Sequence, residues 1–99
     1  MKNPIESLNK LFDSRIRLGV MSVLIVNDSM SFNELKQMLQ LTDGNLASHL
    51  NTLEQAEYIK VQKAFIGKKT NTTYLLTDLG RQAFKTHLDA LEKMIRSTK

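Results

Sequence analysis

Apolar residues recur every three or four positions in the first quarter of the chain, and this spacing predicts two helices. The apolar positions between residues 5 and 12 mark a short N-terminal helix. A second helix starts after Asp13 or Ser14, either of which can cap it, and runs to about Val26. The polar stretch at residues 27–29 then ends this helix.

Two further helix-start signals follow closely on one another. Ser31 and Glu34 have the spacing of a capping box, in which each side chain accepts a hydrogen bond from the other residue's backbone amide. Thr42 can cap another helix, which is predicted over residues 43–57. Because there is room for only a tight turn between Leu39 and Thr42, the two capped helices form a helix-turn-helix.

The helix predicted over residues 43–57 has one apolar and one polar face. Leu46, Leu50 and Leu53 line the apolar face, at the spacing of a helix that packs on a core. The opposite face is polar but uncharged, whereas an ordinary exposed helix is usually rich in charged pairs. Amides and hydroxyls suit the edges of DNA bases because they donate and accept; a plain solvent-exposed surface is the alternative. This face consists of Gly44, Ser48, Asn51 and Gln55, flanked by Asn45 and Thr52.

The last part of the chain predicts a β-hairpin followed by a long helix. Residues 58–66 alternate between apolar and polar and form one strand, residues 67–71 form the turn, and residues 72–76 form the returning strand. Thr77 caps the final helix. The side chains predicted to face inward from the first strand are Ile59, Val61 and Phe65. The whole chain, residues 1–99, is therefore expected to form one mainly α-helical domain with a small hairpin, of the α+β class.

The net charge of the chain is +4, and this excess lies in one segment. Residues 58–77 contain Lys60, Lys63, Lys68 and Lys69 and no acidic residue, so the rest of the chain is neutral in sum. A lysine cluster of this kind favours binding to nucleic acid. The alternative is that the lysines protect an exposed strand from aggregation.

The residues that enzymes and metal sites need are missing or far apart. The chain has no cysteine, and its two histidines, His49 and His87, are distant in the sequence. Ser48 and His49 are adjacent on one helix, so their side chains diverge and cannot pair as nucleophile and base. We therefore predict no catalysis, metal or cofactor. A weaker alternative is a sensor with a small-molecule ligand at the dimer interface near Met94 or His87, but the sequence shows no convincing pocket, so whether an effector exists stays open. With no signal peptide and no apolar run long enough to cross a bilayer, we expect a cytoplasmic protein without membrane contact.

The predicted helix 43–57 and the hairpin together supply two requirements of DNA binding. A helix in the major groove discriminates between sequences, and phosphate contacts give general affinity. We therefore predict sequence-specific binding to double-stranded DNA, with a basic hairpin tip at about 66–72 on the backbone or minor groove. Asp43 repels phosphate, so it serves either to start the helix or to accept from a cytosine amino group. The alternative is a protein–protein interaction module that does not bind DNA. The predicted DNA-contacting residues are Thr42, Asp43, Gly44, Asn45, Ser48, His49, Thr52, Lys63, Lys68, Lys69, Thr70 and Asn71.

Apolar stripes at both ends of the chain predict a homodimer. The stripe in the final helix has a seven-residue rhythm, and little domain remains to cover it. Residues 1–13 and 78–97 are therefore the predicted dimerisation segments. The alternative is that both stripes cover the protomer's own core. The predicted interface consists of Ile5, Leu8, Phe12, Phe84, Leu88, Leu91 and Ile95.

Two motifs also resemble a known family. Residues 41–50, with the Leu53-Glu54-Gln55-Ala56 and Tyr58-Ile59 steps that follow, resemble the recognition segment of bacterial winged helix-turn-helix regulators of the MarR/ArsR-like superfamily. Residues 76–81 are similar to the junction after the wing in the same proteins. The likeness is strongest to the stand-alone winged helix DNA-binding domain group.

The resemblance implies a winged helix fold, a dimer and a role in transcription regulation. It implies that the helix around Asn45, Ser48 and His49 enters the major groove and that residues 68–71 form the wing. One departure is Glu57, which stands where these proteins commonly have a glycine; it implies a different turn or some strain. The cysteine-based metal sensing of some relatives cannot operate in a chain without cysteine.

Overall fold

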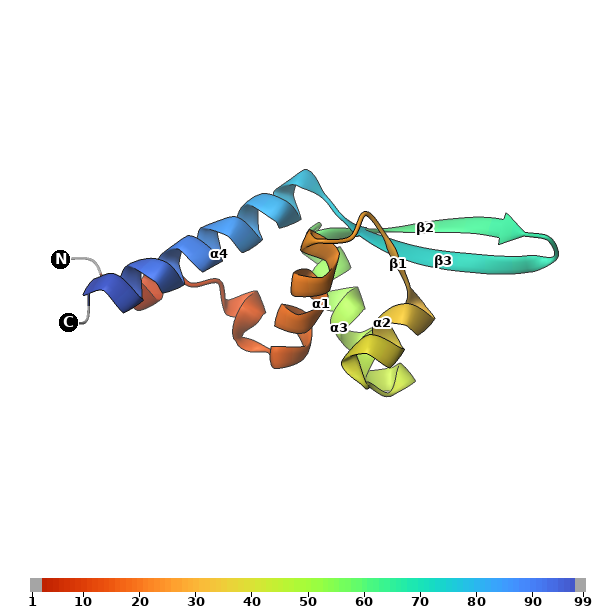
Figure 1. Cartoon of the computed structure of the whole chain (residues 1–99), viewed down its shortest axis with the longest axis horizontal. Helices are drawn as coiled ribbons and strands as arrows, with labels where there is room; N and C mark the ends of the chain where they lie inside the picture. Colours follow the sequence, from red (N-terminus) through yellow and green to blue (C-terminus); the bar gives the residue numbers. More distant parts are fainter. Residues whose placement is uncertain (1–2, 98–99) are drawn as a thin grey trace.

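The computed structural model describes residues 3–97 and shows helices followed by a hairpin and a long helix (Figure 1). The described chain is elongated, with extents of 57 × 25 × 21 Å. The hairpin protrudes at one end, and the first short helix lies beside the end of the last helix at the other. In order, the elements are the 3-10 helices η1 (Pro4–Ser7) and η2 (Lys10–Asp13), α1 (Arg15–Ile25), β1 (Met30–Ser31), α2 (Phe32–Leu39), α3 (Asp43–Gln55), β2 (Ile59–Ile66), β3 (Lys69–Leu76) and α4 (Asp78–Ser97).

The predicted helix caps of the helix-turn-helix are confirmed. Ser31 Oγ accepts from the Glu34 amide at 3.1 Å, and Glu34 Oε1 accepts from the Ser31 amide at 2.9 Å. The second bond holds the pKa of the exposed Glu34 carboxyl below its ordinary value, because the carboxylate accepts from the Ser31 backbone amide. Thr42 Oγ1 caps α3 by accepting from the Asn45 amide at 3.2 Å. Local hydrogen bonds thus start both helices, as the sequence predicted.

The N-terminal segment forms two short 3-10 helices instead of the single helix that was predicted. Asn9 separates them, because its backbone is extended and both its amide groups donate to residues outside the two helices. Its amide donates to His87 Nδ1 at 3.0 Å, and its side chain donates to the Tyr58 hydroxyl at 2.9 Å. Its Oδ1 also accepts from the Leu11 amide, which starts η2. Asn9 therefore joins the N-terminal segment to α4 and to the start of the hairpin.

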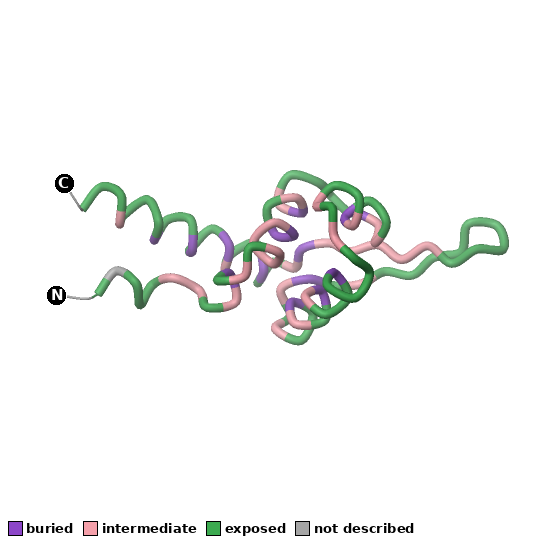
Figure 2. The backbone as a smooth tube through the Cα atoms, turned by 90° about the horizontal axis from the view of Figure 1, so that it is seen from below, coloured by how far each residue is buried: buried purple, intermediate pink, exposed green. Residues whose placement is uncertain are grey.

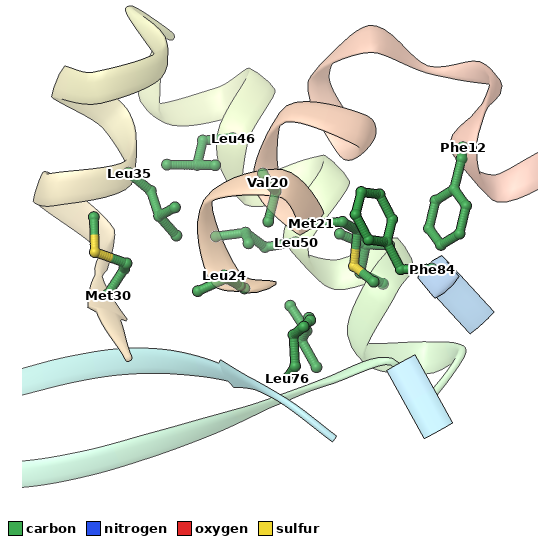
Figure 3. Close-up of a cluster of buried hydrophobic side chains, with 12 residues drawn as sticks. Phe12, Val20, Met21, Leu24, Met30, Leu35, Leu46, Leu50, Leu76 and Phe84 are labelled. Atoms are coloured by element: carbon green, nitrogen blue, oxygen red, sulfur yellow. The ribbon is translucent and has the colours of Figure 1, made fainter. Parts of the chain in front are cut away.

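One apolar cluster holds the helices and the base of the hairpin together (Figure 3). Phe12 and Phe84 belong to it, each 3% exposed, with their rings edge to face at 5.7 Å. The prediction that these two residues lie at a dimer interface is therefore wrong, because each fills the protomer's own core. The buried apolar cluster comprises Phe12, Val20, Met21, Leu24, Met30, Leu35, Leu46, Leu50, Leu53, Ile59, Leu76 and Phe84.

The sheet contains a third strand that was not predicted. Its antiparallel order is β1-β3-β2, and β1 is only two residues long, with Met30 opposite Tyr74. The hairpin turn is also tighter than expected, because Ile66 already pairs with Lys69. Gly67, at the first of the two turn positions, has φ 66°, which a two-residue hairpin turn requires there. The hairpin therefore keeps its strand pairing almost to its end.

The turn after α3 carries the base of the hairpin and the start of α4. The helix ends at Gln55, and Glu57 adopts a left-handed φ of 63°. The Glu57 amide bonds to the Glu54 carbonyl and the Tyr58 amide to the Leu53 carbonyl, which is the double-bonded helix end that usually contains glycine. Glu57 thus keeps the ordinary turn in a strained conformation.

Helix α4 approaches this turn very closely. A Cβ atom on Gly80 would lie 2.0 Å from the Tyr58 carbonyl oxygen, so a residue without a side chain is needed. Thr77 completes the junction: its hydroxyl donates to the Glu57 carbonyl at 2.6 Å and accepts from the Gly80 amide at 2.9 Å. These contacts determine the direction in which the hairpin leaves the domain.

Candidate nucleic-acid interface

The predicted polar face of α3 is exposed. Leu46, Leu50 and Leu53 are at most 2% exposed and hold the helix against the core. Gly44 is open to approach, since a Cβ built on it meets nothing within 4 Å. The exposed side chains of the outer face are Asn45, Ser48, Asn51 and Gln55, with Thr52 half-buried at its side.

The first turn of α3 carries an acidic group that is compensated. Asp43 lies 2.7 Å from the ammonium of Lys36 on α2, in a pair exposed to solvent. A negative group at a helix N-terminus is favourable, and the lysine offsets its charge toward an approaching phosphate. Thr42 lies at the same end with its oxygen engaged in the helix cap. Asp43 therefore has a role in starting the helix and in pairing with α2.

His49 lies at the side of α3 that faces α1. Its Nδ1 is 2.9 Å from Arg17 Nη1, and Arg17 Nε donates to the Leu11 carbonyl at 2.6 Å. Because a guanidinium has only donors, Nδ1 accepts and the neutral ring carries its proton on Nε2. Burial, and then the nearby Arg17 charge, lower the pKa of His49. Arg17 is a residue that the sequence analysis missed, because its partners are brought together by the tertiary fold.

The wing, defined as β2, β3 and their turn, presents its lysines on two different faces. Side chains alternate along a strand, and Lys63 pairs with Thr72 while Ile66 pairs with Lys69. Lys63 and Thr70 consequently lie on one face, and Lys69 and Asn71 lie on the other. The first face continues toward the body as a groove lined by Val61, Lys63, Thr72 and Tyr74 of the wing and by Glu54 of α3.

The outer half of the wing is exposed, and this corrects one prediction. Phe65 was expected to face inward with Ile59 and Val61, but it is 80% exposed. The alternation persists, as Phe65 does share a face with those residues, but the helical body ends before it (Figure 2). Ile66, on the other face, is 67% exposed. Neither Phe65 nor Ile66 was predicted from the sequence to lie in a binding site.

The two remaining features to consider are metal ligands and membrane-spanning helices. Among residues 3–97 there is no group of three or more histidine, aspartate or glutamate side chains that could hold a metal ion. His87 is 5% exposed and packs edge to face on Phe12 with ring centres 5.1 Å apart. Within the same range, no helix is both long and apolar enough to cross a membrane.

A capped helix-turn-helix followed by a hairpin wing and a further helix defines a winged helix-turn-helix domain. The family model described as "Winged helix DNA-binding domain" matches residues 16–95. The chain therefore belongs to the winged helix DNA-binding domain family, which confirms the resemblance seen in its sequence motifs. Family and fold are those of DNA-binding transcriptional regulators.

Individual proteins support this assignment. The protein MJ0432 of Methanocaldococcus jannaschii is 37% identical over 79 residues, covering 80% of this chain and 86% of the relative. The structure of a transcriptional regulator homologue from Pyrococcus horikoshii has a TM-score of 0.77 and 32% identity, covering 92% of this chain and 95% of that chain. MepR of S. aureus, solved as a DNA complex, has a TM-score of 0.77 with 16% identity over 93% of this chain and 75% of its own, and shares the fold alone.

Proposed function

We propose that this protein is a homodimeric transcriptional regulator that binds double-stranded DNA sequence-specifically. Helix α3 lies in the major groove, and the wing contacts the backbone or the minor groove. The observation that carries the proposal is the exposed, uncharged polar face of α3 beside a hairpin whose segment, residues 58–77, contains four lysines and no acid. MepR, which shares the fold, was solved as a DNA complex, and this supports DNA binding by the present chain.

The two parts of this surface have separate roles. Ser48, Asn51 and Gln55 donate and accept hydrogen bonds without a net charge, so they distinguish bases by the pattern of groups on the base edges. The wing lysines neutralise phosphates whatever the sequence, and they release counterions on binding. The helix therefore determines which duplex is bound, and the wing determines how tightly any duplex is bound.

The dimer is supported by the distribution of apolar side chains around α4. One side of α4, with Ala83, His87, Ala90 and Met94, is buried or half-buried against the protomer itself, and α4 contacts η1. A neighbouring side exposes large apolar residues over the part of α4 that extends beyond the body (Figure 1). These are Leu88 (46% exposed), Leu91 (36%) and Ile95 (74%), with Ile5 (61%) on the N-terminal segment. A second copy of the chain covers this surface and presents two α3 helices to half-sites on the order of 34 Å apart.

The DNA-binding proposal is tested by selecting bound duplexes from a random pool and measuring affinity for the selected site against salt. The double variant Lys68→Ala, Lys69→Ala is expected to weaken all duplexes alike and to reduce the slope of log affinity against log salt by about 1 for each phosphate that the variant no longer neutralises. Ser48→Ala is expected to change the preferred base at one position by about tenfold or more. Lys85→Ala, an exposed lysine on α4, is the control and leaves the slope unchanged.

The dimer has its own test in sedimentation analysis. Leu88→Glu is expected to give monomers and to lower affinity for a two-half-site duplex far more than for one half-site. Leu79→Glu is the matched control, because Leu79 is 52% exposed on the opposite side of the same helix.

A wild-type protein that retards no duplex at micromolar concentration and low salt overturns DNA binding and favours a protein-interaction module. A wild-type monomer at high concentration overturns the dimer.

A further inference from the structure

The tip of the wing carries two large apolar side chains that the fold does not use. Phe65 is 80% exposed and Ile66 is 67% exposed, although both lie within the lysine-bearing, acid-free segment of residues 58–77. Neither belongs to the apolar cluster or to the side chains packed against it. Burying an aromatic ring is among the largest gains that a side chain can supply at an interface. An exposed phenylalanine at the end of a projecting hairpin therefore points to a partner.

The strand register determines which way Phe65 points. Phe65 pairs with Thr70 and shares a face with Lys63 and Val61, whereas Ile66 pairs with Lys69 on the opposite face. The face of Phe65 is the one that lines the groove with Glu54 of α3. Phe65 thus lies on the α3 side of the wing, with a cation two residues away on the same face.

Charge complementarity selects the kind of partner. An aromatic side chain carried by a segment that contains four lysines and no acid suits a polyanion with apolar faces to stack on, and duplex DNA has both. An acid-free lysine cluster disfavours a second wing as the partner, because two copies would bring like charges together. The wing's exposed Phe65 and lysines therefore match a groove of DNA better than another copy of themselves.

We propose that Phe65 inserts as an apolar wedge between two base pairs in the minor groove beside the site contacted by α3, unstacking that step and kinking the duplex. The proposal rests on the DNA binding proposed above. Apolar side chains used in this way bend DNA by about 20–90°, toward the major groove. Pyrimidine–purine steps such as TA unstack most readily, so the wedge makes the protein selective at flanking positions where no base edge is contacted.

The test uses the full chain and a duplex selected by the wild-type protein, with 2-aminopurine placed in turn at each flanking step. Wild type is expected to raise the fluorescence severalfold at one step on each side and to shorten the end-to-end distance measured by energy transfer between dyes at the duplex ends. Phe65→Ala is expected to abolish both signals and to remove most of the preference for TA over GG at that step. Phe65→Leu retains an apolar wedge and is expected to keep much of both signals.

The matched control is Ile66, because the strand register places it on the opposite face from Phe65. Ile66→Ala removes a similar apolar area from the opposite face and is expected to leave fluorescence and bend unchanged. If wild type binds the selected duplex but neither signal differs between wild type and Phe65→Ala, the wedge is wrong and the proposed function stands. If wild type binds no duplex, the proposed function itself fails. If Phe65→Ala changes the oligomeric state without DNA, Phe65 belongs to a contact between copies and the wedge is overturned.

Discussion

The base and the tip of the wing share one pattern of side chains but have different surroundings. Along one face of β2, Ile59 is 2% exposed, and Phe65, three positions further on that face, is 80% exposed. On β3, Leu76 is 8% exposed at the base, while Thr70 opposite Phe65 is exposed. The difference arises because the helical body covers the inner end of the hairpin and ends before its outer half (Figure 2).

This contrast separates residues that hold the fold from residues that are free to contact a partner. At the base, Thr77 and Gly80 are tied to the turn at Tyr58 through hydrogen bonds and a very close approach. At the tip, the requirement that the fold imposes is a positive φ at Gly67. Folding therefore places little constraint on the side chains at the tip, and substituting them tests binding without disturbing stability.

The largest expected effect on the free energy of unfolding comes from comparing alanine substitutions at Ile59 and Phe65, which lie at the two ends of one face of β2. Ile59→Ala removes buried methyl groups and is expected to lower the free energy of unfolding by about 3 kcal/mol. Phe65→Ala removes a larger side chain but one already in water, so its expected effect is within about 0.5 kcal/mol. Urea unfolding followed by circular dichroism measures both. Equal losses for the two variants would falsify the division between base and tip.

Local signals explain what could be predicted from the sequence. The capping box at Ser31 and Glu34 and the cap at Thr42 depend on residues three positions apart, so their geometry is readable without the fold. The polar face of α3 follows in the same way from helical periodicity. The family resemblance adds that these elements belong to a winged helix, which periodicity alone does not show.

Features that depend on distant segments could not be predicted. Alternation shows that Phe65 and Ile59 share a face, but not how far the body beneath them extends. The strand at Met30 is two residues long and exists because Tyr74 lies opposite it. His49 and Arg17 meet through the packing of α3 on α1, and no local sequence pattern predicts their hydrogen bond. The prediction of dimer contacts was wrong for Phe12 and Phe84, because an apolar helical stripe does not show whether the protomer itself or a second copy covers it.

A second pair of substitutions compares threonine at the base and at the tip. Thr77→Val keeps the shape of the side chain but loses the hydrogen bonds to the Glu57 carbonyl and from the Gly80 amide. We expect it to lower the free energy of unfolding by about 1–2 kcal/mol, as for loss of a helix cap. Thr70→Val, on the exposed part of β3, is expected to change it by less than about 0.5 kcal/mol. A neutral Thr77→Val would show that the junction is held by packing alone.

A smaller effect of opposite sign is expected at the turn that leads into the base. Glu57 has φ 63°, which costs an ordinary residue roughly 1–2 kcal/mol, partly offset by the greater unfolded-state freedom of glycine. Glu57→Gly is therefore expected to stabilise the protein by about 0.5–1 kcal/mol in thermal unfolding. Glu57→Ala, which keeps a Cβ and removes the charge, is the control and gains little. Equal gains for both variants would assign the effect to charge instead of backbone strain.

The smallest effect concerns the side of α3 away from the wing, where stability depends on pH. Burial and Arg17 lower the pKa of His49 from its ordinary value of 6.5, so the unfolded chain takes up the proton first as the pH falls. The neutral His49 ring makes its full contribution to the free energy of unfolding above about pH 6.5, and this contribution declines at lower pH. His49→Gln keeps an acceptor for Arg17 that does not titrate, and comparing the two proteins cancels every other titrating group. We expect the melting temperature of wild type to fall further than that of His49→Gln between pH 7 and pH 5; a constant difference between the two curves would show that the Arg17–His49 bond is not coupled to protonation.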